Sequence, residues 1–194
     1  MVHKSFIIFC LLTLVAGGLF FAPPAEAKDA VDAEQAKENL AYSLGVQAYI
    51  WGYPIWMNQR SRDVLTAVEK VGKQGRAPVN VMMFASKLVS HTFRGVKSPN
   101  NDTLYSNSYM DLSKEPMVLT MPDIVDRFYT FQFIDAYTNN FHYISSLTCG
   151  TVGGNFAIVG PGWSGQLPSG VERIDAPTPE LYMVGRILVD GTED

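Results

Sequence analysis

Hydrophobic and polar residues follow two different periods along this chain of 194 residues. In the N-terminal part the apolar residues recur at helical spacing, as at Leu40, Leu44 and Ala48. From Pro99 onward the pattern changes to short segments with strand-like alternation. These segments are separated by turns that are rich in Gly, Pro, Asn and Asp. The sequence therefore predicts an α+β protein in which N-terminal helices pack on an antiparallel β-sheet or sandwich.

The segment 28–96 is predicted to be mainly helical. A first helix is expected to end near Trp51, because Gly52-Tyr53-Pro54 follows and proline removes a backbone donor and restricts the residue before it. A second helix is expected to begin at this proline and to end near Gly72. The apolar run from Val81 to Val89 fits a short helix or a buried strand, and we favour the helix.

The segment 97–176 is predicted to be mainly β. Its strand-like segments are 104–111, 117–121, 127–134, 141–145, 156–159 and 171–174. The last segment, 177–194, begins with two prolines and continues into the amphipathic stretch Glu180 to Val189. We interpret it as the start of a short C-terminal helix.

The first 27 residues have the composition of a secretory signal peptide. Lys4 precedes an apolar run from Phe6 to Phe21, and Ala25-Glu26-Ala27 supplies small residues at a cleavage site. The alternative is an uncleaved membrane anchor, since the run approaches the roughly 17 residues that span a bilayer. The cleavage site favours removal before Lys28. The mature chain 28–194 is then expected to be a single domain without a membrane span, in the periplasm or outside the cell.

Charge and cysteine content argue against two classes of protein. Cleavage would remove Lys4 and Glu26, one residue of each sign, and so would leave the formal net charge of −4 unchanged. A chain without basic surplus has little to offer nucleic-acid phosphates, so no nucleic-acid partner is predicted. Only Cys149 would survive cleavage, which excludes a disulfide framework and favours a buried structural thiol.

The densest cluster of polar side chains is the stretch Ser98 to Ser106, which runs directly into a predicted strand. One interpretation is a capped turn, because Asn and Asp side chains bond to nearby backbone amides. The other is that Asn100, Asn101, Asp102 and Tyr105 face a ligand cleft. The sequence leaves both interpretations open.

Acid-base chemistry has few candidate groups in this chain. Asp135 and His142 would meet across a hairpin that turns at residues 136–140, and such a pair can transfer protons. A catalytic metal normally takes three protein ligands, and a third would have to come from a residue such as Asp102. We therefore predict no metal site and no cofactor, and we take Asp102, Asp135 and His142 as the catalytic candidates.

Seven sequence blocks occur together in order along the mature chain. They are Tyr49 to Pro54, Ser98 to Ser106, Asp111 to Pro116, Arg127 to Tyr129, Asp135 to Asn139, Ile158 to Trp163 and Gly185 to Gly191. In this combination the chain resembles the bacterial domain-of-unknown-function family 1254. The resemblance implies a mostly β N-terminal domain with helical additions, usually followed by a second β-rich domain of unknown-function family 1214. Nothing matching that second domain is present, so we expect a fragment or one half of a split pair.

The family has no defined activity, so the resemblance implies no catalytic residue. It implies only that certain residues lie in the family's characteristic blocks. The candidate ligand-binding residues are Asn100, Asn101, Tyr105, Arg127, Asn139 and Trp163. The leading hypothesis is an exported protein that forms part of a polar small-molecule site, with hydrolytic or acid-base chemistry. The alternatives are a non-catalytic ligand-binding or interaction module and a truncated half-protein that needs a partner domain or chain of the 1214 type.

Overall fold

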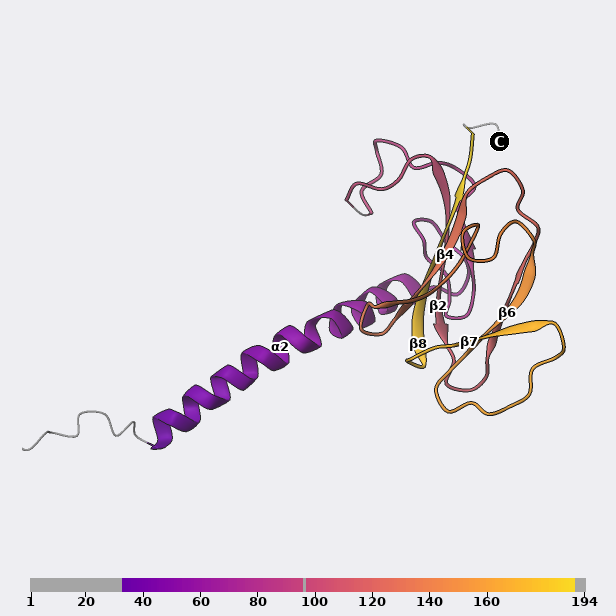
Figure 1. The fold of residues 1–194 in the computed structure, drawn as a ribbon. Helices are drawn as coiled ribbons and strands as arrows, with labels where there is room; N and C mark the ends of the chain where they lie inside the picture. The colour runs from indigo at the N-terminus through magenta and orange to yellow at the C-terminus, as the bar shows by residue number, and fades with distance from the viewer. Residues whose placement is uncertain (1–32, 96, 191–194) are drawn as a thin grey trace, which may run out of the picture. The chain divides into compact units, whose positions relative to one another are not determined.

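A computed structural model describes residues 33–95 and 97–190 of the chain (Figure 1). The predicted signal peptide lies outside the described residues. The chain divides between Tyr49 and Ile50 into two compact units. The described elements are α2 (Ala33–Thr66), β1 (Met83–Phe84), β2 (Thr103–Asp111), β3 (Met117–Met121), β4 (Tyr129–Asp135), β5 (Asn140–Ser145), β6 (Gly154–Val159), β7 (Val171–Asp175) and β8 (Glu180–Leu188).

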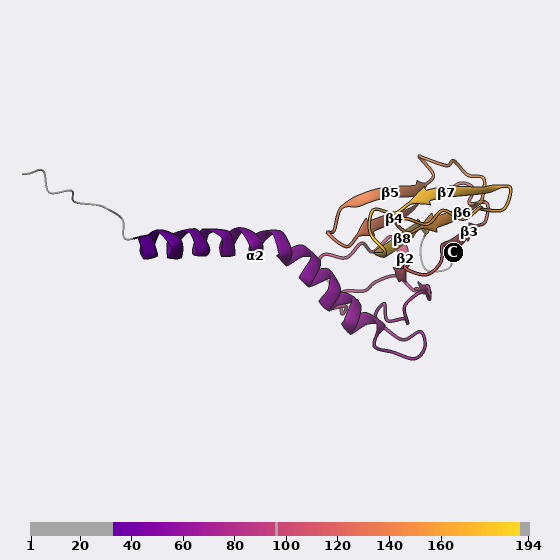
Figure 2. The same ribbon diagram turned by 90° about the horizontal axis from the view of Figure 1, so that it is seen from below.

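The strands form two sheets, which lie side by side in Figures 1 and 2. The larger sheet has the order β1-β2-β8-β4-β5 and is antiparallel at every pairing. The smaller has the order β3-β6-β7, in which β3 and β6 are antiparallel and β6 and β7 are parallel. The predicted α+β class with a sandwich-like arrangement of sheets is confirmed, and so are all six predicted strand segments.

One apolar core lies between the sheets. Phe133 and Ile144 of the larger sheet and Ile158 of the smaller one are fully buried in it. Burial alternates along β4, where every second side chain from Tyr129 to Asp135 is buried. Each large apolar side chain buried in this way contributes about 1.5–3 kcal/mol. The same alternation turns the remaining residues of β4 to the opposite face, where the candidate site lies.

The predicted C-terminal helix is wrong, because Glu180 to Leu188 form strand β8 at the centre of the larger sheet. All nine of its residues pair with β2, and seven pair with β4 on the other side. Leu181 and Met183 point into the core while Tyr182 and Arg186 occupy the opposite face. This period of two fits a strand. The two prolines before Glu180 therefore precede a strand and not the first turn of a helix.

The predicted break at Pro54 is also wrong, since α2 continues through this residue to Thr66. An internal proline costs a helix about 3 kcal/mol, so the C-terminal part of α2 needs stabilising contacts. Asn58 Nδ2 donates hydrogen bonds to the carbonyl oxygens of Asp135 and Ala136 at 3.4 and 3.3 Å. Arg62 forms an ion pair with Glu180 at 3.2 Å. These contacts hold the second half of the helix on the sheet.

The segment after α2 is less helical than predicted. The helix ends at Thr66 rather than near Gly72, and the favoured helix at 81–89 is replaced by the two-residue strand β1. Side-chain amides join this segment to β2. Asn107 Nδ2 donates to the carbonyl of Gly75 at 2.9 Å, and Asn80 Oδ1 accepts from the Asp111 amide at 2.8 Å.

We expect Gly185→Ala to lower the free energy of unfolding by about 1–3 kcal/mol, the usual cost of overpacking a core. A Cβ at this position would lie 2.2 Å from Ser106 Oγ and 2.6 Å from a ring carbon of Phe131. The matched control is Gly52→Ala in α2, where a Cβ meets nothing within 4 Å. That variant should stabilise by up to about 1 kcal/mol. Urea unfolding of both variants checks this, and equal stabilities would contradict the packing of β8 against β2.

Candidate functional site

The outer face of the larger sheet, which points away from the core, carries a connected row of polar and aromatic side chains. We name it the polar row, and it consists of Asn100, Tyr105, Arg186, Gln132 and Asn140. The Asn100 amide donates to the Tyr105 hydroxyl at 2.8 Å. The Arg186 guanidinium lies 5.5 Å from the centre of the Tyr105 ring, and its Nη1 donates to Gln132 Oε1 at 3.3 Å. Gln132 Nε2 in turn donates to Asn140 Oδ1. The row therefore crosses β2, β8, β4 and β5.

Strand register explains why these residues meet. Tyr105 lies directly opposite Arg186 in the pairing of β2 with β8. Arg186 lies opposite Thr130 in the pairing of β8 with β4, which places Gln132 at the diagonal position. Residues opposite one another in a sheet point to the same face, and diagonal neighbours are within reach of long side chains.

Arg186 is the charged centre of the polar row. It is half-buried, and a guanidinium has five N–H donors, of which Gln132 takes one. Within the described part of the chain no carboxylate lies at ion-pair distance from Arg186. A cation fixed between an aromatic face and an amide, without a neutralising acid, is suited to an anion.

The other end of the outer face is covered by the second half of α2. Its side chains differ from those of the polar row. The rings of Tyr109 and Tyr182 lie 4.5 Å apart there, and Arg62 is neutralised by its ion pair with Glu180. Burial, followed by the neighbouring Tyr182, raises the pKa of Tyr109 well above its usual range. Tyr109 is therefore protonated at neutral pH and cannot act as a general base there.

The stretch Ser98 to Ser106 forms local hydrogen bonds at the beginning of β2. The Asp102 amide donates to Asn100 Oδ1 at 2.9 Å, and the Asp102 carbonyl accepts from the Val189 amide at 3.1 Å. Asn101 and Asp102 are both exposed. These bonds are those of a capped turn, and the contact of Asn100 with Tyr105 joins the same turn to the polar row. The contacts described here are those of the capped-turn interpretation.

The Asp135 carboxylate closes the hairpin between β4 and β5. Its side chain is 5% exposed. It accepts hydrogen bonds from the amides of Tyr137 and Asn139 at 2.9 and 2.8 Å, and from Asn139 Nδ2 at 3.1 Å. Asp135 and the predicted ligand-binding residue Asn139 therefore meet, but as partners within a turn.

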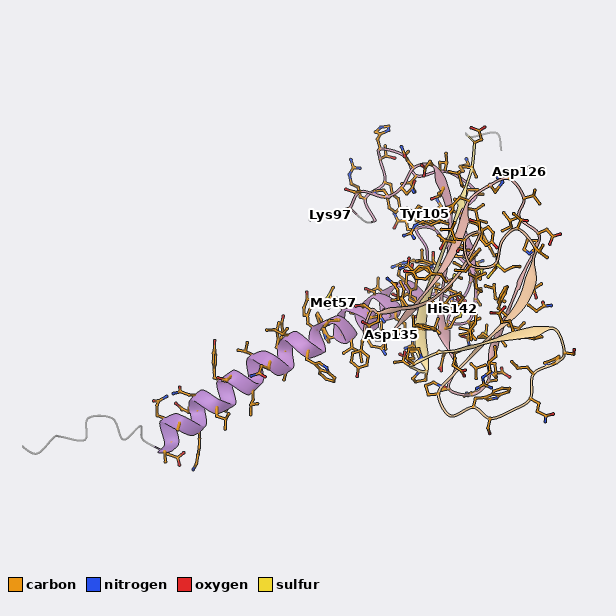
Figure 3. The ribbon with its side chains drawn as sticks, in the orientation of Figure 1. Met57, Lys97, Tyr105, Asp126, Asp135 and His142 are labelled. Carbon is orange, nitrogen blue, oxygen red and sulfur yellow. The ribbon has the colours of Figure 1, made fainter. Side chains whose placement is uncertain are left out.

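His142 lies on β5, opposite Phe133, with the two rings 6.1 Å apart (Figure 3). Among the described residues no hydrogen bond or ion pair joins His142 to Asp135. Both come from one hairpin, as the sequence suggested, without the direct contact that proton transfer between them requires.

Asp102 and Asp135 lie at opposite ends of the larger sheet. Asp135 pairs with Leu181, whereas Thr103, the residue after Asp102, pairs with Leu188. The seven residue steps from Leu181 to Leu188 along β8 correspond to roughly 23 Å at the usual rise of a strand. The catalytic candidates are therefore not brought together in one place.

Arg127 and Trp163 lie outside the polar row. Arg127 Nη1 donates to the carbonyl of Leu188 at 3.4 Å, at the end of β8. Trp163 lies in the loop between β6 and β7, with the Arg173 guanidinium 5.4 Å from its ring centre. Arg173 also pairs with Asp175 at 2.8 Å, so this aromatic site already has a neutralised cation of its own.

The candidates chosen from sequence missed three residues of the polar row, which are Arg186, Gln132 and Asn140. Arg186 lies in the block Gly185 to Gly191, which carries the family resemblance, but it was not chosen as a site residue. The available signal for a strand was the content of β-branched and aromatic residues, Tyr182, Val184 and Ile187, in a segment that follows two prolines. The pairing of this strand with β2 could not be deduced from that signal.

Two searches of the described residues were negative. No group of three or more His, Cys, Asp or Glu side chains there is arranged to hold a metal ion. No helix in the same part of the chain has the length and apolar character needed to cross a bilayer.

Comparison with known proteins gives a family and a similar fold. Residues 79–194 match the family described as Protein of unknown function (DUF1254). The structure is similar to the crystal structure of the VPA0106 protein from Vibrio parahaemolyticus, with a TM-score of 0.61 and 28% identity. That match covers 75% of this chain and 32% of the Vibrio chain, so the chain spans about a third of the length of that protein.

A more distant match is to an uncharacterized protein from Burkholderia cenocepacia, with a TM-score of 0.40 and 13% identity. It covers 57% of this chain and 31% of that chain. No curated protein matches the chain.

We expect Asp135→Ala to lower the free energy of unfolding by about 2–3 kcal/mol, because hydrogen bonds to a charged group are lost from a buried turn. The matched substitution Asp102→Ala, at an exposed carboxylate, should change stability by less than about 0.5 kcal/mol. Chemical denaturation of the two variants under identical conditions provides the comparison. A fully stable Asp135→Ala variant would show that this carboxylate is not needed for the hairpin and would favour a functional role for it.

Proposed function

This chain belongs to the DUF1254 family, whose function is unknown, and we propose that its polar row is one wall of a binding site for a small anionic ligand. The ligand class is a carboxylate or a similar compact oxyanion. The chain's own contribution is binding rather than a chemical step.

The observation that carries this proposal is the position of Arg186 on the outer face of the sheet. Its guanidinium is held by the Tyr105 ring and Gln132 and has no carboxylate partner among the described residues. Arginine pairs with carboxylates through two parallel hydrogen bonds, and its fixed planar fork loses little freedom on binding. The contrast with Arg62 and Arg173 supports the assignment, since each of those has an acidic partner.

The neighbours of Arg186 support a ligand with a polar or planar body. Tyr143 lies opposite Gln132 on the same face and is 41% exposed. Tyr105 and Tyr143 supply aromatic surface, while Gln132 and Asn140 supply amide groups. Such sites combine apolar contact with a few polar groups that fix the ligand's orientation.

Hydrolytic or acid-base chemistry has less support within this chain. Asp135 is engaged by its own hairpin, and Asp102 lies at the other end of the sheet. A reaction at the polar row would need acid or base groups from elsewhere. We propose that a second β-rich domain or chain supplies the opposite wall of the site, which is consistent with a match to only 32% of the Vibrio protein.

We also propose that the protein is exported to the periplasm or the extracellular space. The support is the composition of residues 1–27, in which a basic start, an apolar run and a small-residue cleavage site follow one another. A small polar metabolite in that compartment would be accessible to the polar row.

We expect the full chain to bind benzoate more tightly than its neutral analogue benzamide, with an affinity that falls as salt is added. Arg186→Gln should weaken benzoate binding by about 10- to 100-fold, the usual value of a hydrogen bond to a charged group. Arg173→Gln is the matched control and should leave the affinity unchanged. Isothermal titration calorimetry measures all three proteins, with succinate and phosphate as further probes of the anion class. Equal affinities for benzoate and benzamide, or unchanged binding by Arg186→Gln, would refute the anionic site.

Expression in a bacterium with its own secretion machinery tests export. The intact mass of the purified protein should correspond to a chain that begins at Lys28, and the protein should be released by osmotic shock. Replacement of Ala27 by Tyr should block cleavage, because the processing site requires a small residue. A full-length mass for the native sequence would contradict the predicted cleavage.

A further inference from the structure

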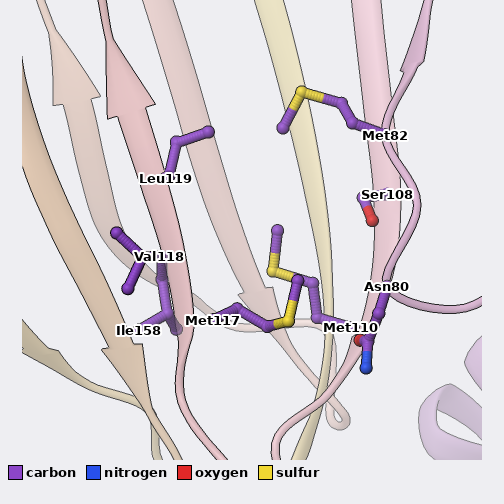
Figure 4. A pocket seen from close by; sticks show the side chains of 8 residues that line it. All are labelled: Asn80, Met82, Ser108, Met110, Met117, Val118, Leu119 and Ile158. Atoms are coloured by element: carbon purple, nitrogen blue, oxygen red, sulfur yellow. The ribbon is translucent and has the colours of Figure 1, made fainter.

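A partly open pocket of about 140 Å³ lies on the other face of β2 from the polar row, and the exposed residues Asn80 and Val118 belong to its lining (Figure 4). One wall is formed by β2 of the larger sheet and the opposite wall by β3 and β6 of the smaller sheet. Residues 80–82, which precede β1, contribute the third side. We name this space the methionine cavity after Met82, Met110 and Met117, which line it.

Small side chains on β2 explain why the space is open. The core-facing positions before Met110 are occupied by Ser106 and Ser108, and Ser106 pairs with Gly185 of β8. Larger apolar residues at these positions would fill a gap of this kind, because protein interiors are otherwise packed as densely as organic crystals. The small side chain of Ser108 therefore leaves room between β2 and the residues of β3 that line the cavity.

The lining is mainly apolar and adaptable. Leu119 and Ile158 form the wall on the side of the smaller sheet, and the three methionines surround the remaining space. Methionine has a flexible, polarizable side chain that fits ligands of different shape and makes favourable contacts with aromatic rings. An apolar guest of matching size would therefore be well accommodated.

The buried hydroxyl of Ser108 places a polar group at the wall of the cavity. Ser108 is 2% exposed, and its hydroxyl makes a single contact in the described part of the chain, at 3.4 Å to the carbonyl of the adjacent Tyr109. Ser106 Oγ, two residues earlier on the same face of β2, is buried without a partner among the described residues. Buried hydroxyls are normally satisfied by protein, water or a ligand. Ser108 thus retains hydrogen-bonding capacity at the cavity wall.

We propose that the methionine cavity binds a small, mainly apolar molecule with one hydroxyl or carbonyl group, which pairs with Ser108. The volume suits a guest of about the size of benzene, since an engineered apolar cavity of about 150 Å³ in another protein binds that molecule. This site is separate from the polar row, because adjacent positions of β2 point to opposite faces. Its ligand and its test are therefore independent of the proposed function.

The experiment follows the methyl groups of the methionines in the full chain by NMR, after labelling of methionine with ¹³C at the ε-methyl. Titration with phenol should shift the signals of Met82, Met110 and Met117 in a saturable manner. Met57 of α2 does not line the cavity and is the internal control. Absence of shifts, or equal shifts at Met57, would overturn the proposal by showing a hydrated or non-specific site.

Two comparisons then test the hydrogen bond to Ser108. Phenol should bind more tightly than toluene, which has a methyl group in place of the hydroxyl. Ser108→Ala should weaken phenol binding by about 2- to 12-fold and leave toluene binding unchanged, as expected for one neutral hydrogen bond. Ser164→Ala in the exposed loop after β6 is the matched control. Equal loss for both ligands would instead indicate a disturbed cavity and would overturn the role of Ser108.

Blocking the cavity tests the location independently of Ser108. Leu119→Trp places a larger side chain in the space and should abolish the phenol-induced shifts at Met110 and Met117. Circular dichroism and thermal unfolding establish that the variant is folded. Retention of phenol binding by a folded Leu119→Trp protein would place the binding site elsewhere and contradict the proposal.

Discussion

The insertion of β8 between β2 and β4 is the interaction on which the rest of the structure depends. β8 is the last strand described, yet it makes the two longest pairings in the larger sheet. Without it, β2 would pair only with the two residues of β1, and β4 would pair only with β5 in a hairpin. The pairing of Thr103 with Leu188 joins distant parts of the chain, and such non-local contacts form late and slow the folding of β proteins.

The register of β8 also decides which of its side chains face the apolar core and which face the polar outer side of the sheet. Leu181 and Met183 enter the core, and Gly185 leaves space for Ser106. Tyr182 and Arg186 are on the opposite face, where Arg186 meets Tyr105 and Gln132. A shift of one residue would exchange the two faces and would bury the guanidinium in an apolar core. The polar row and the methionine cavity on the core side of β2 are therefore two consequences of the same register.

The polar residues that attract attention in the sequence have largely structural contacts. Asp135 uses its carboxylate to close a hairpin, and Asn100 caps the turn that begins β2. Turn residues of this type look like catalytic residues in a sequence because both functions require short polar side chains near glycine and proline. Arg186 has the opposite character, since it lies in a mainly apolar strand and its family block, Gly185 to Gly191, does not indicate a role for it. Its importance comes from the neighbours that β2 and β4 bring to it.

The sequence by itself determined the α+β class, the six strands between residues 97 and 176 and the family. These depend on local periodicity, turn chemistry and ordered sequence blocks, all of which are read within short windows. The tertiary structure alone decided that Glu180 to Leu188 form a strand, that α2 continues through Pro54, and which polar residues meet. The physical reason is that intrinsic preferences for helix or strand amount to less than about 1 kcal/mol per residue for most residues. Pairing on both edges of β8, and the contacts of Asn58 and Arg62 in the second half of α2 with the larger sheet, outweigh preferences of that size.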